Sequence, residues 1–281
     1  MQISAVIPSH NRRHTLERAL RSVFEQSSAV EEVILVDDGS TDGSAEMVAC
    51  EFAEVKIIQQ PNLGVSAARN RGIETARHDW IALLDSDDSW LAHKIEKIRL
   101  AQRQQPGFVL YHSDEIWMRR GVRVNPMRKH RKQGGWIFEQ CLPLCAISPS
   151  AAVIRKSVLQ ELGMFDPGLP ACEDYDLWLR LCHRFPVHYL EEALIVKYGG
   201  HDDQLSRRHP AMDQFRARSL HRLLREANLA DSQQEAAREV LMAKLDILLK
   251  GANRHGNQAL IDEFAPLREY WRGPAQRKAS C

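Results

Sequence analysis

Three short polar segments in the first third of the chain carry side chains suited to binding a nucleotide and a cation. They read Pro8-Ser9-His10-Asn11, Asp37-Asp38 and Asp85-Ser86-Asp87-Asp88, and together they contain five carboxylates. Five carboxylates at one place would repel one another unless a cation or a ligand rich in hydrogen-bond donors lay among them. If the fold brings these segments together, the sequence predicts a metal-assisted site.

The elements that could bring them together follow a regular alternation. Four apolar runs predict strands, at 3–7, 33–36, 55–58 and 80–84. The segments between them have apolar residues at helical spacing, at 16–24, 45–52 and 65–76. Apolar strands alternating with amphipathic helices indicate an α/β fold with a parallel sheet covered on both faces. Ligands of such sheets bind beyond the carboxyl ends of the strands, and the three polar segments follow three of these ends.

The pattern changes after residue 106. We expect strands at 108–112 and 151–154, and a hairpin whose arms, 116–118 and 122–124, flank Arg119-Arg120-Gly121. A helix should begin at Glu173, with Trp178 in the core, and from about residue 210 the apolar stripes predict only helices.

The composition excludes several classes of protein. The chain has 281 residues, of which 44% are hydrophobic, and its 38 Lys and Arg against 37 Asp and Glu give a net charge of +1, which disfavours nucleic acid as a partner. No apolar run approaches the roughly 18 residues of a membrane span, and no signal peptide precedes the first expected strand. The six cysteines form no Cys-x-x-Cys pair, so we expect reduced thiols in a cytoplasmic protein without structural zinc.

The segment after the first expected strand lacks a glycine-rich loop for phosphate. Neither Gly-x-Gly-x-x-Gly nor a loop ending in Gly-Lys-Ser/Thr is present. Carboxylates could therefore hold a diphosphate only through a bridging Mg²⁺ or Mn²⁺. A metal-dependent nucleotidyltransferase is an alternative that also uses carboxylates at strand ends, but it should carry a Gly-rich, basic loop where Pro8-Ser9-His10-Asn11 stands.

Six motifs in a fixed order give the chain a resemblance to a known family. They are Val6 to Arg12, Val36 to Asp42, Asn62 to Asn70, Leu84 to Asp88, Gly163 to Asp166, and Glu173 to Arg180. In these segments the chain resembles a family 2 glycosyltransferase of the GT-A fold. The resemblance covers about 1–205 and implies a mixed sheet with a parallel nucleotide-binding half flanked by helices. The apolar stripes beyond it predict a helical C-terminal extension over 206–281.

The resemblance implies a nucleotide-binding role for several of these residues. Asp38 would accept a hydrogen bond from the imino N–H of the base, helped by Pro8-Ser9-His10-Asn11. Such a carboxylate favours UDP or dTDP sugars, although the N1–H of guanine also qualifies GDP. Asp85 would face the ribose, with Ser86 beside it. Arg69 would lie near the donor diphosphate, unless it belongs to a solvated helix face.

The resemblance also implies a metal and a general base. Asp87 is the first candidate ligand for Mn²⁺ or Mg²⁺, Asp88 is a close alternative, and His201 is a further candidate. Asp174 would remove a proton from the acceptor hydroxyl as it attacks the anomeric carbon, in a single displacement that inverts configuration. Asp174 and Glu173 would alternatively only stabilise a helix N-terminus through the helix dipole.

Two basic segments bear on the acceptor. Residues 119–132 contain seven Lys or Arg and no acid, and residues 206–225 contain six Arg and one Asp, so the rest of the chain is acidic. The run 128–132 could attract an anionic, lipid-linked acceptor, or it could be a solvated loop. The helix that carries Arg216 to Arg225 could lie on an anionic membrane, but its short apolar stripe favours a packed extension.

We therefore expect a cytoplasmic, inverting hexosyltransferase that depends on a divalent metal and has no nucleic-acid partner. Its acceptor would be a glycan, a lipid-linked molecule or a small molecule, reached through peripheral contact with the inner face of a membrane in the lipid-linked case. An alternative from another class is a catalytically silent subunit that binds nucleotide sugars. The presence of both Asp87 and Asp174 favours an enzyme, because a pure binder needs no base.

Overall fold

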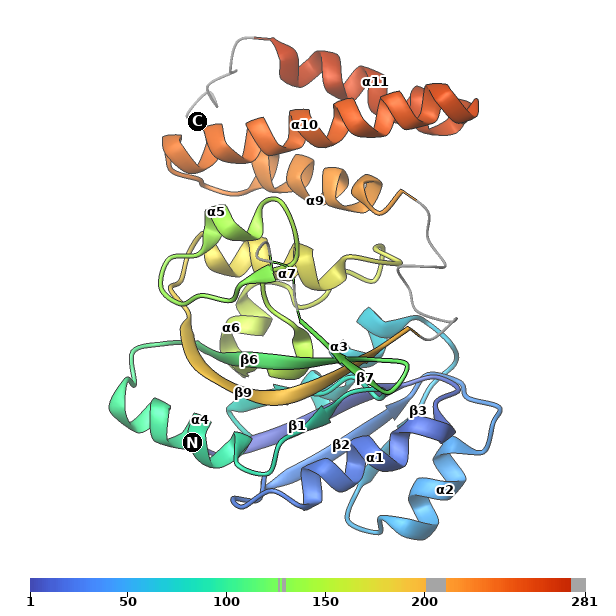
Figure 1. The fold of residues 1–281 in the computed structure, drawn as a ribbon, viewed down its shortest axis with the longest axis vertical. Helices are drawn as coiled ribbons and strands as arrows, with labels where there is room; N and C mark the ends of the chain where they lie inside the picture. Colours follow the sequence, from blue (N-terminus) through green and yellow to red (C-terminus); the bar gives the residue numbers. More distant parts are fainter. Residues whose placement is uncertain (126, 128–129, 201–210, 274–281) are drawn as a thin grey trace.

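The structure, a computed structural model, describes residues 1–125, 127, 130–200 and 211–273. One mixed sheet has the strand order β3-β2-β1-β4-β8-β6-β9-β5, with β7 paired to β6 (Figure 1). Its parallel half consists of β1 (Ile3–Ser9), β2 (Glu32–Asp37), β3 (Lys56–Gln59) and β4 (Trp80–Leu83). These four strands lie where the apolar runs predict them, which confirms the α/β prediction.

The other half of the sheet is mostly antiparallel. It consists of β5 (Ser89–Trp90), β6 (Leu110–Arg119), β7 (Val122–Val124), β8 (Val153–Arg155) and β9 (His188–Gly199). Strand β8 joins the two halves because it pairs antiparallel to both β4 and β6. The predicted strand at 108–112 and the first arm of the predicted hairpin form one strand, β6, whereas β9 was not predicted.

Helices cover both faces of the sheet. On one face lie α1 (Arg13–Phe24), α2 (Ser44–Glu51) and α4 (Lys94–Gln104), packed on alternate residues of β1 such as Ile3 and Ile7. On the other face, α3 (Val65–Thr75), α5 (Phe138–Cys141), α6 (Lys156–Glu161) and α7 (Glu173–Cys182) share a core with Val6. This burial of both faces explains why the parallel strands are continuous apolar runs.

The C-terminal helices extend the second core. Helices α9 (Asp213–Glu226), α10 (Asp231–His255) and α11 (Gln258–Arg272) stack outward from α7 (Figure 1). Three arginines of α9 form ion pairs with carboxylates of the same chain. These pairs are Arg216 with Asp213, Arg218 with Glu263, and Arg222 with Asp166 and Asp176. Helix α9 is therefore a packed extension, as its short apolar stripe predicts, and these three arginines do not form a membrane-binding face.

A buried lysine beneath β5 gives a testable dependence of stability on pH. Lys94 is fully buried, its amine donates to the backbone oxygen of Ala151 at 3.2 Å, and it lies 4.8 Å from the centroid of the Trp90 ring. Burial lowers the pKa of Lys94 to about 7. In the unfolded chain the amine keeps its proton up to a pH of about 10. The unfolded state therefore binds more protons above pH 7, so this group makes stability rise with pH.

We expect Lys94→Met to remove this contribution. The free energy of unfolding of the wild type, measured relative to the variant, should rise by about 1.4 kcal/mol per pH unit above pH 7. Urea unfolding of both proteins at pH 7 and pH 9 measures the difference. If the free energies of unfolding of the two proteins differ by the same amount at pH 7 and pH 9, Lys94 is charged in the folded protein.

Candidate active site

The carboxyl ends of β1, β2 and β4 meet at one edge of the sheet. Ser9 is in register with Asp37, and the backbone N–H of Asp38 donates to the oxygen of Ser9 at 2.8 Å. The N–H of Leu84 donates to the oxygen of Val6 at 3.1 Å. The three polar segments therefore share one edge, as the sequence predicts.

His10 joins the loops that follow β1 and β2. Its Nδ1 lies 2.9 Å from the backbone oxygen of Asp38, and its Nε2 lies 3.1 Å from the Asn62 amide nitrogen. Both contacts are satisfied if Nδ1–H donates to Asp38 and Nε2 accepts from Asn62, which defines a neutral tautomer. Asn11, with a φ of +52°, accepts from the N–H of Thr41 at 2.8 Å. These contacts hold together the loops after β1 and β2, where the sequence predicts the nucleotide site.

Asp38 shapes the loop that leads into α3. It is buried, and its Oδ1 accepts hydrogen bonds from the Gln60 amide at 2.7 Å and from the N–H of Leu63 at 2.9 Å. Its Oδ2 accepts from the N–H of Gly64 at 2.8 Å. The structure thus gives Asp38 a structural role that no motif in the sequence indicates. Because a carboxylate oxygen has two lone pairs, Oδ2 has capacity for a second donor such as a base N–H.

Arg69 joins the loop after β4 to helix α7. The residue is only 3% exposed, and its two terminal nitrogens donate to Asp85 Oδ1 at 2.7 Å and to Glu173 Oε1 at 2.6 Å. Burial lowers the pKa of Arg69, but the negative charges of Asp85 and Glu173 raise it by a larger amount. The net shift of the pKa is therefore upward, and the guanidinium stays charged. The prediction of a solvated helix face for Arg69 is therefore wrong.

Asp87 and Asp88 lie in different environments. Asp88 is 2% exposed, its Oδ2 accepts from the Ser150 hydroxyl at 2.6 Å, and its Oδ1 accepts from the N–H of Tyr198 at 3.1 Å. Burial raises the pKa of Asp88 to about 8, and the nearby Lys197 amine opposes this shift. Asp87 is partly exposed, and the adjacent Ser86 is buried. Asp87 is thus the more accessible of the two candidate ligands.

Asp87 is the carboxylate of this pair whose exposure suits a metal shared with a nucleotide. Within the described residues, no three His, Cys, Asp or Glu side chains are close enough together to hold a metal ion by themselves. Mg²⁺ at nucleotide sites is usually held by one or two carboxylates together with substrate phosphates and water. The partly exposed Asp87 fits that pattern. The predicted ligand His201 lies outside the described residues.

Asp174 lies in the first turn of α7, next to the Glu173 that pairs with Arg69. Its Oδ1 accepts from the N–H of Tyr175 at 2.7 Å. The Cys145 Sγ lies 3.1 Å from its Oδ2 and also 3.1 Å from the backbone oxygen of Ile147, so the single thiol proton can be donated to either acceptor. Burial, and then the charge of Asp174, raise the pKa of Cys145 well above its usual range, so the thiol remains a protonated donor. The sequence predicts only that Cys145 is a reduced thiol, and no spacing in it indicates this contact.

Comparison with known proteins decides the family. The profile described as "Glycosyl transferase family 2" matches residues 4–163, which is more than half of the chain. The chain belongs to glycosyl transferase family 2. An uncharacterized glycosyltransferase of Rickettsia conorii is 29% identical over 201 residues, covering 69% of this chain and 32% of the relative. The chain therefore spans about a third of that relative's length.

Two further proteins are similar to this family 2 glycosyltransferase. The Escherichia coli protein named UDP-Glc:alpha-D-GlcNAc-diphosphoundecaprenol beta-1,3-glucosyltransferase WfgD is 30% identical over 183 residues, covering 64% of this chain and 69% of WfgD. The crystal structure of Staphylococcus aureus TarS 1–349 in complex with UDP-GlcNAc superposes with a TM-score of 0.70 at 18% identity, covering 89% of this chain and 73% of TarS 1–349. The likeness to TarS confirms the predicted GT-A fold.

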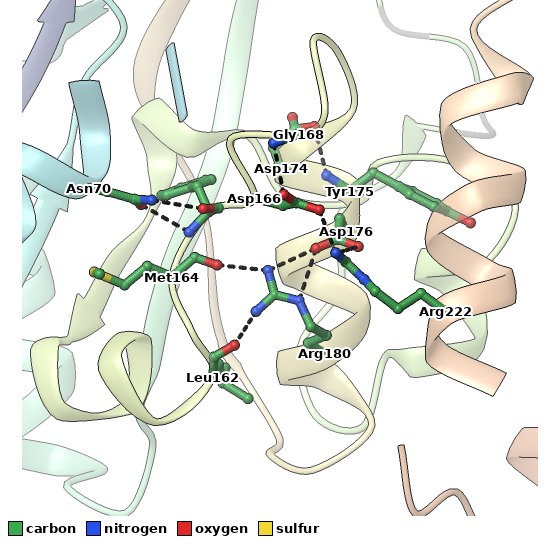
Figure 2. A network of polar contacts seen from close by, with 11 residues as sticks. Asn70, Leu162, Met164, Asp166, Gly168, Asp174, Tyr175, Asp176, Arg180 and Arg222 are labelled. Atoms are coloured by element: carbon green, nitrogen blue, oxygen red, sulfur yellow. Dashed lines mark hydrogen bonds and ion pairs between the residues drawn. The ribbon is translucent and has the colours of Figure 1, made fainter. Parts of the chain in front are cut away.

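A polar network holds the N-terminal half of α7 in the glycosyltransferase (Figure 2). Asp176 accepts from Arg180 at 2.9 Å and from Arg222 of α9 at 2.6 Å. Arg222 also pairs with Asp166, and Asn70 of α3 exchanges hydrogen bonds with the backbone of Phe165 at 2.7 and 3.0 Å. Helix α3, the loop with Phe165 and Asp166, and helix α9 are thus linked in one network to the helix that carries Asp174.

The predicted basic run at 128–132 does not behave as one solvated loop. Lys132 is 8% exposed, lies 3.3 Å from the buried Glu115, and donates to the Ser148 hydroxyl at 3.2 Å. Lys197 donates to the same hydroxyl at 3.1 Å. Lys132 is therefore part of a buried charge network beneath Asp88, and the prediction of a solvated position for it is wrong. Arg131 is exposed, and residues 128 and 129 lie outside the described residues.

Trp178 is fully buried, and its indole N–H donates to the backbone oxygen of Ile147 at 2.8 Å, so its predicted core position is confirmed.

Among the described residues, no helix is both long enough and apolar enough to cross a bilayer.

Proposed function

We propose that this family 2 glycosyltransferase transfers a hexose from a UDP sugar to a hydroxyl of a lipid-linked glycan, with inversion at the anomeric carbon. The arrangement of Arg69 carries the proposal, because one buried guanidinium joins Asp85 of the donor-side loop to the turn that carries Asp174. The name of WfgD specifies a UDP-glucose donor and a diphosphoundecaprenol-linked acceptor, and TarS was crystallised with UDP-GlcNAc. Both relatives support this class of donor.

Asp174 would act as the general base. Its Oδ2 would accept the proton of the acceptor hydroxyl while the hydroxyl oxygen bonds to the anomeric carbon and the bond to the nucleoside diphosphate breaks. The Cys145 thiol, 3.1 Å from the same oxygen, would hold the carboxylate in one orientation. Because a single displacement occurs from the face opposite the leaving group, the product has inverted configuration.

Asp87 would hold a Mg²⁺ or Mn²⁺ ion together with phosphate oxygens of the donor. Such an ion supplies positive charge that stabilises the departing nucleoside diphosphate. Asp88 would support the loop from beneath, because both its oxygens already accept hydrogen bonds from Ser150 and Tyr198. Asp38 would accept a hydrogen bond from the N3–H of uracil, with His10 fixing the loop beside it.

A nucleotide panel tests the donor and the metal together. With UDP at a hundred times its dissociation constant, we expect the melting temperature to rise by about 5 °C, and more when Mn²⁺ is added. Asp87→Asn should keep the shift caused by UDP alone and lose the increment due to Mn²⁺. Differential scanning fluorimetry with UDP, dTDP, GDP and UTP, each with and without Mn²⁺, measures these shifts.

The panel also separates the alternatives. A larger shift with GDP would contradict the assignment of Asp38 to uracil or thymine. Shifts that Mn²⁺ leaves unchanged would remove the metal from the mechanism. A larger shift with UTP than with UDP, followed by release of pyrophosphate, would favour a nucleotidyltransferase. Donor binding without any transfer to lipid-linked acceptors or hydrolysis of UDP sugars would favour a silent binding subunit.

A further inference from the structure

The hairpin formed by β6 and β7 ends in a tight, exposed tip. Its loop is Arg120-Gly121, with φ values of +50° and +77°, which are typical of the two-residue turn that fits the twist of a hairpin. In the strands beside this loop, Arg119 is in register with Val122, and Met118 is in register with Arg123. Paired residues of antiparallel strands project on the same face, so arginines and apolar side chains are interleaved on both faces of the tip.

The positive charges of this tip are not neutralised by carboxylates of the described residues. Arg119, Arg120 and Arg123 are all exposed, and within the described residues none of them forms an ion pair or a side-chain hydrogen bond. Three arginines of α9 differ, because Arg216, Arg218 and Arg222 each pair with a carboxylate. Val122 is 65% exposed, and Met127, just beyond β7, is 60% exposed. Positive charge and exposed apolar side chains therefore lie next to one another at and just beyond this turn.

The tip is continuous with the candidate active site. Strand β9 runs beside β6, with Gly199 in register with Arg119 (Figure 1). One residue earlier, the N–H of Tyr198 donates to Asp88 Oδ1 at 3.1 Å. A surface that binds the tip would consequently lie close to the loop that carries Asp87 and Asp88.

We propose that the tip, defined as Arg119, Arg120, Val122 and Arg123, binds the anionic surface of a lipid bilayer. This inference rests on the proposed function, in which the acceptor is linked to a lipid. Arginines near an anionic membrane surface are attracted by its negative potential, and exposed apolar side chains enter the headgroup region. Binding there holds the active-site edge of the sheet at the membrane, where a lipid-linked acceptor presents its hydroxyl.

The same features disfavour a nucleic acid as the partner. Single-stranded nucleic acids bind basic grooves in which aromatic side chains stack on the bases. The aromatic residue of the hairpin, Trp117, is partly buried and its indole N–H donates to Glu115 at 2.6 Å. Its ring packs on His130, with the centroids 5.2 Å apart. The exposed side chain among the arginines is instead the aliphatic Val122.

Vesicle sedimentation tests the proposal directly. We expect the wild-type chain to sediment with vesicles of phosphatidylcholine and phosphatidylglycerol, and to stay in solution with phosphatidylcholine alone. The triple variant Arg119→Gln/Arg120→Gln/Arg123→Gln should partition about a hundredfold more weakly, because each arginine near the surface contributes about fivefold. Val122→Ser should weaken binding without changing its salt dependence.

A charge-matched variant separates the tip from the net charge. Arg103, Lys250 and Arg254 are exposed cations on α4 and α10, and replacing all three with glutamine removes the same charge. This control should bind vesicles like the wild type. Equal loss of binding in both triple variants, or equal binding to neutral vesicles, would overturn the proposal. Displacement from vesicles by an RNA oligonucleotide at matched phosphate concentration, with retention by the RNA, would assign the tip to nucleic acid instead.

The proposed function and this inference can fail separately. The tip triple variant should show the same UDP-induced rise in melting temperature as the wild type, because Arg119, Arg120 and Arg123 do not contact the candidate nucleotide site. Absence of that rise in the wild type would refute the donor assignment and leave vesicle binding as an independent result. Loss of vesicle binding by the triple variant with an unchanged UDP shift supports the tip as a membrane contact.

Discussion

Replacing Asp174 with asparagine is expected to leave the affinity for UDP within twofold of the wild type and to lower the rate constant of sugar transfer about a thousandfold. Asparagine has nearly the same shape, and its side-chain oxygen can still accept from the N–H of Tyr175 or the Cys145 thiol. It cannot, however, take a proton from an acceptor hydroxyl. Isothermal titration with UDP and a transfer assay at saturating donor measure the two quantities.

The competing role for Asp174 is stabilisation of the N-terminus of α7. Asp231 offers a matched control, since it is an exposed acid in the first turn of α10. If only the helix dipole matters, Asp174→Asn and Asp231→Asn should each cost about 0.3–1 kcal/mol of stability and change turnover alike. Equal loss of UDP affinity and turnover in Asp174→Asn, with a lower melting temperature, would identify a structural role.

A role for Cys145 in orienting the base can be separated from packing in the same assays. Cys145→Ser keeps a donor for Asp174 Oδ2, whereas Cys145→Ala removes it. We expect the serine variant to retain most of the wild-type turnover and the alanine variant to lose about tenfold, the difference expected for one hydrogen bond to a charged group. Equal turnover in both variants would show that the thiol does not orient the base.

The nucleotide half of the fold could be predicted because its signals are local. A strand buried on both faces must be apolar at every position, so β1, β2 and β4 stand out as continuous runs. The acidic segments follow these runs directly, and parallel strands bring their carboxyl ends to one edge. The strand β9 could not be predicted from the hydrophobic pattern, because its sequence, HYLEEALIVKYG, is neither apolar throughout nor strictly alternating.

The contacts that organise the site could not be predicted because they join residues far apart in the chain. Arg69 reaches Asp85 16 residues away and Glu173 104 residues away. Lys132 lies in a basic run that is typical of a solvated loop, but the charge of Glu115 is buried beside it and requires a partner. Neither local spacing nor net charge contains this information, since it depends on which strands become neighbours in the second half of the sheet.

Arg69→Met is expected to destabilise the protein by about 3 kcal/mol, because it leaves the buried carboxylate of Glu173 without its partner. Burial raises the pKa of Glu173, and Arg69 opposes this shift, so removing Arg69 raises the pKa further. The folded variant then binds a proton that the unfolded chain releases above a pH of about 4.3. The destabilisation should therefore be smaller at pH 5 than at pH 8, as urea unfolding at both values will measure.

A second variant, in which Glu173 is also replaced, separates the role of Arg69 as the partner of Glu173 from direct binding of the donor diphosphate. Arg69→Met/Glu173→Gln should recover part of the stability, because a neutral amide replaces the unpaired charge, but not the transfer rate. If Arg69 positions Asp85 and α7, the single variant should weaken UDP and UMP binding to the same small extent and lower turnover about a hundredfold through displacement of Asp174. A large loss of affinity for UDP but not for UMP, with unchanged stability, would instead place the guanidinium on the diphosphate.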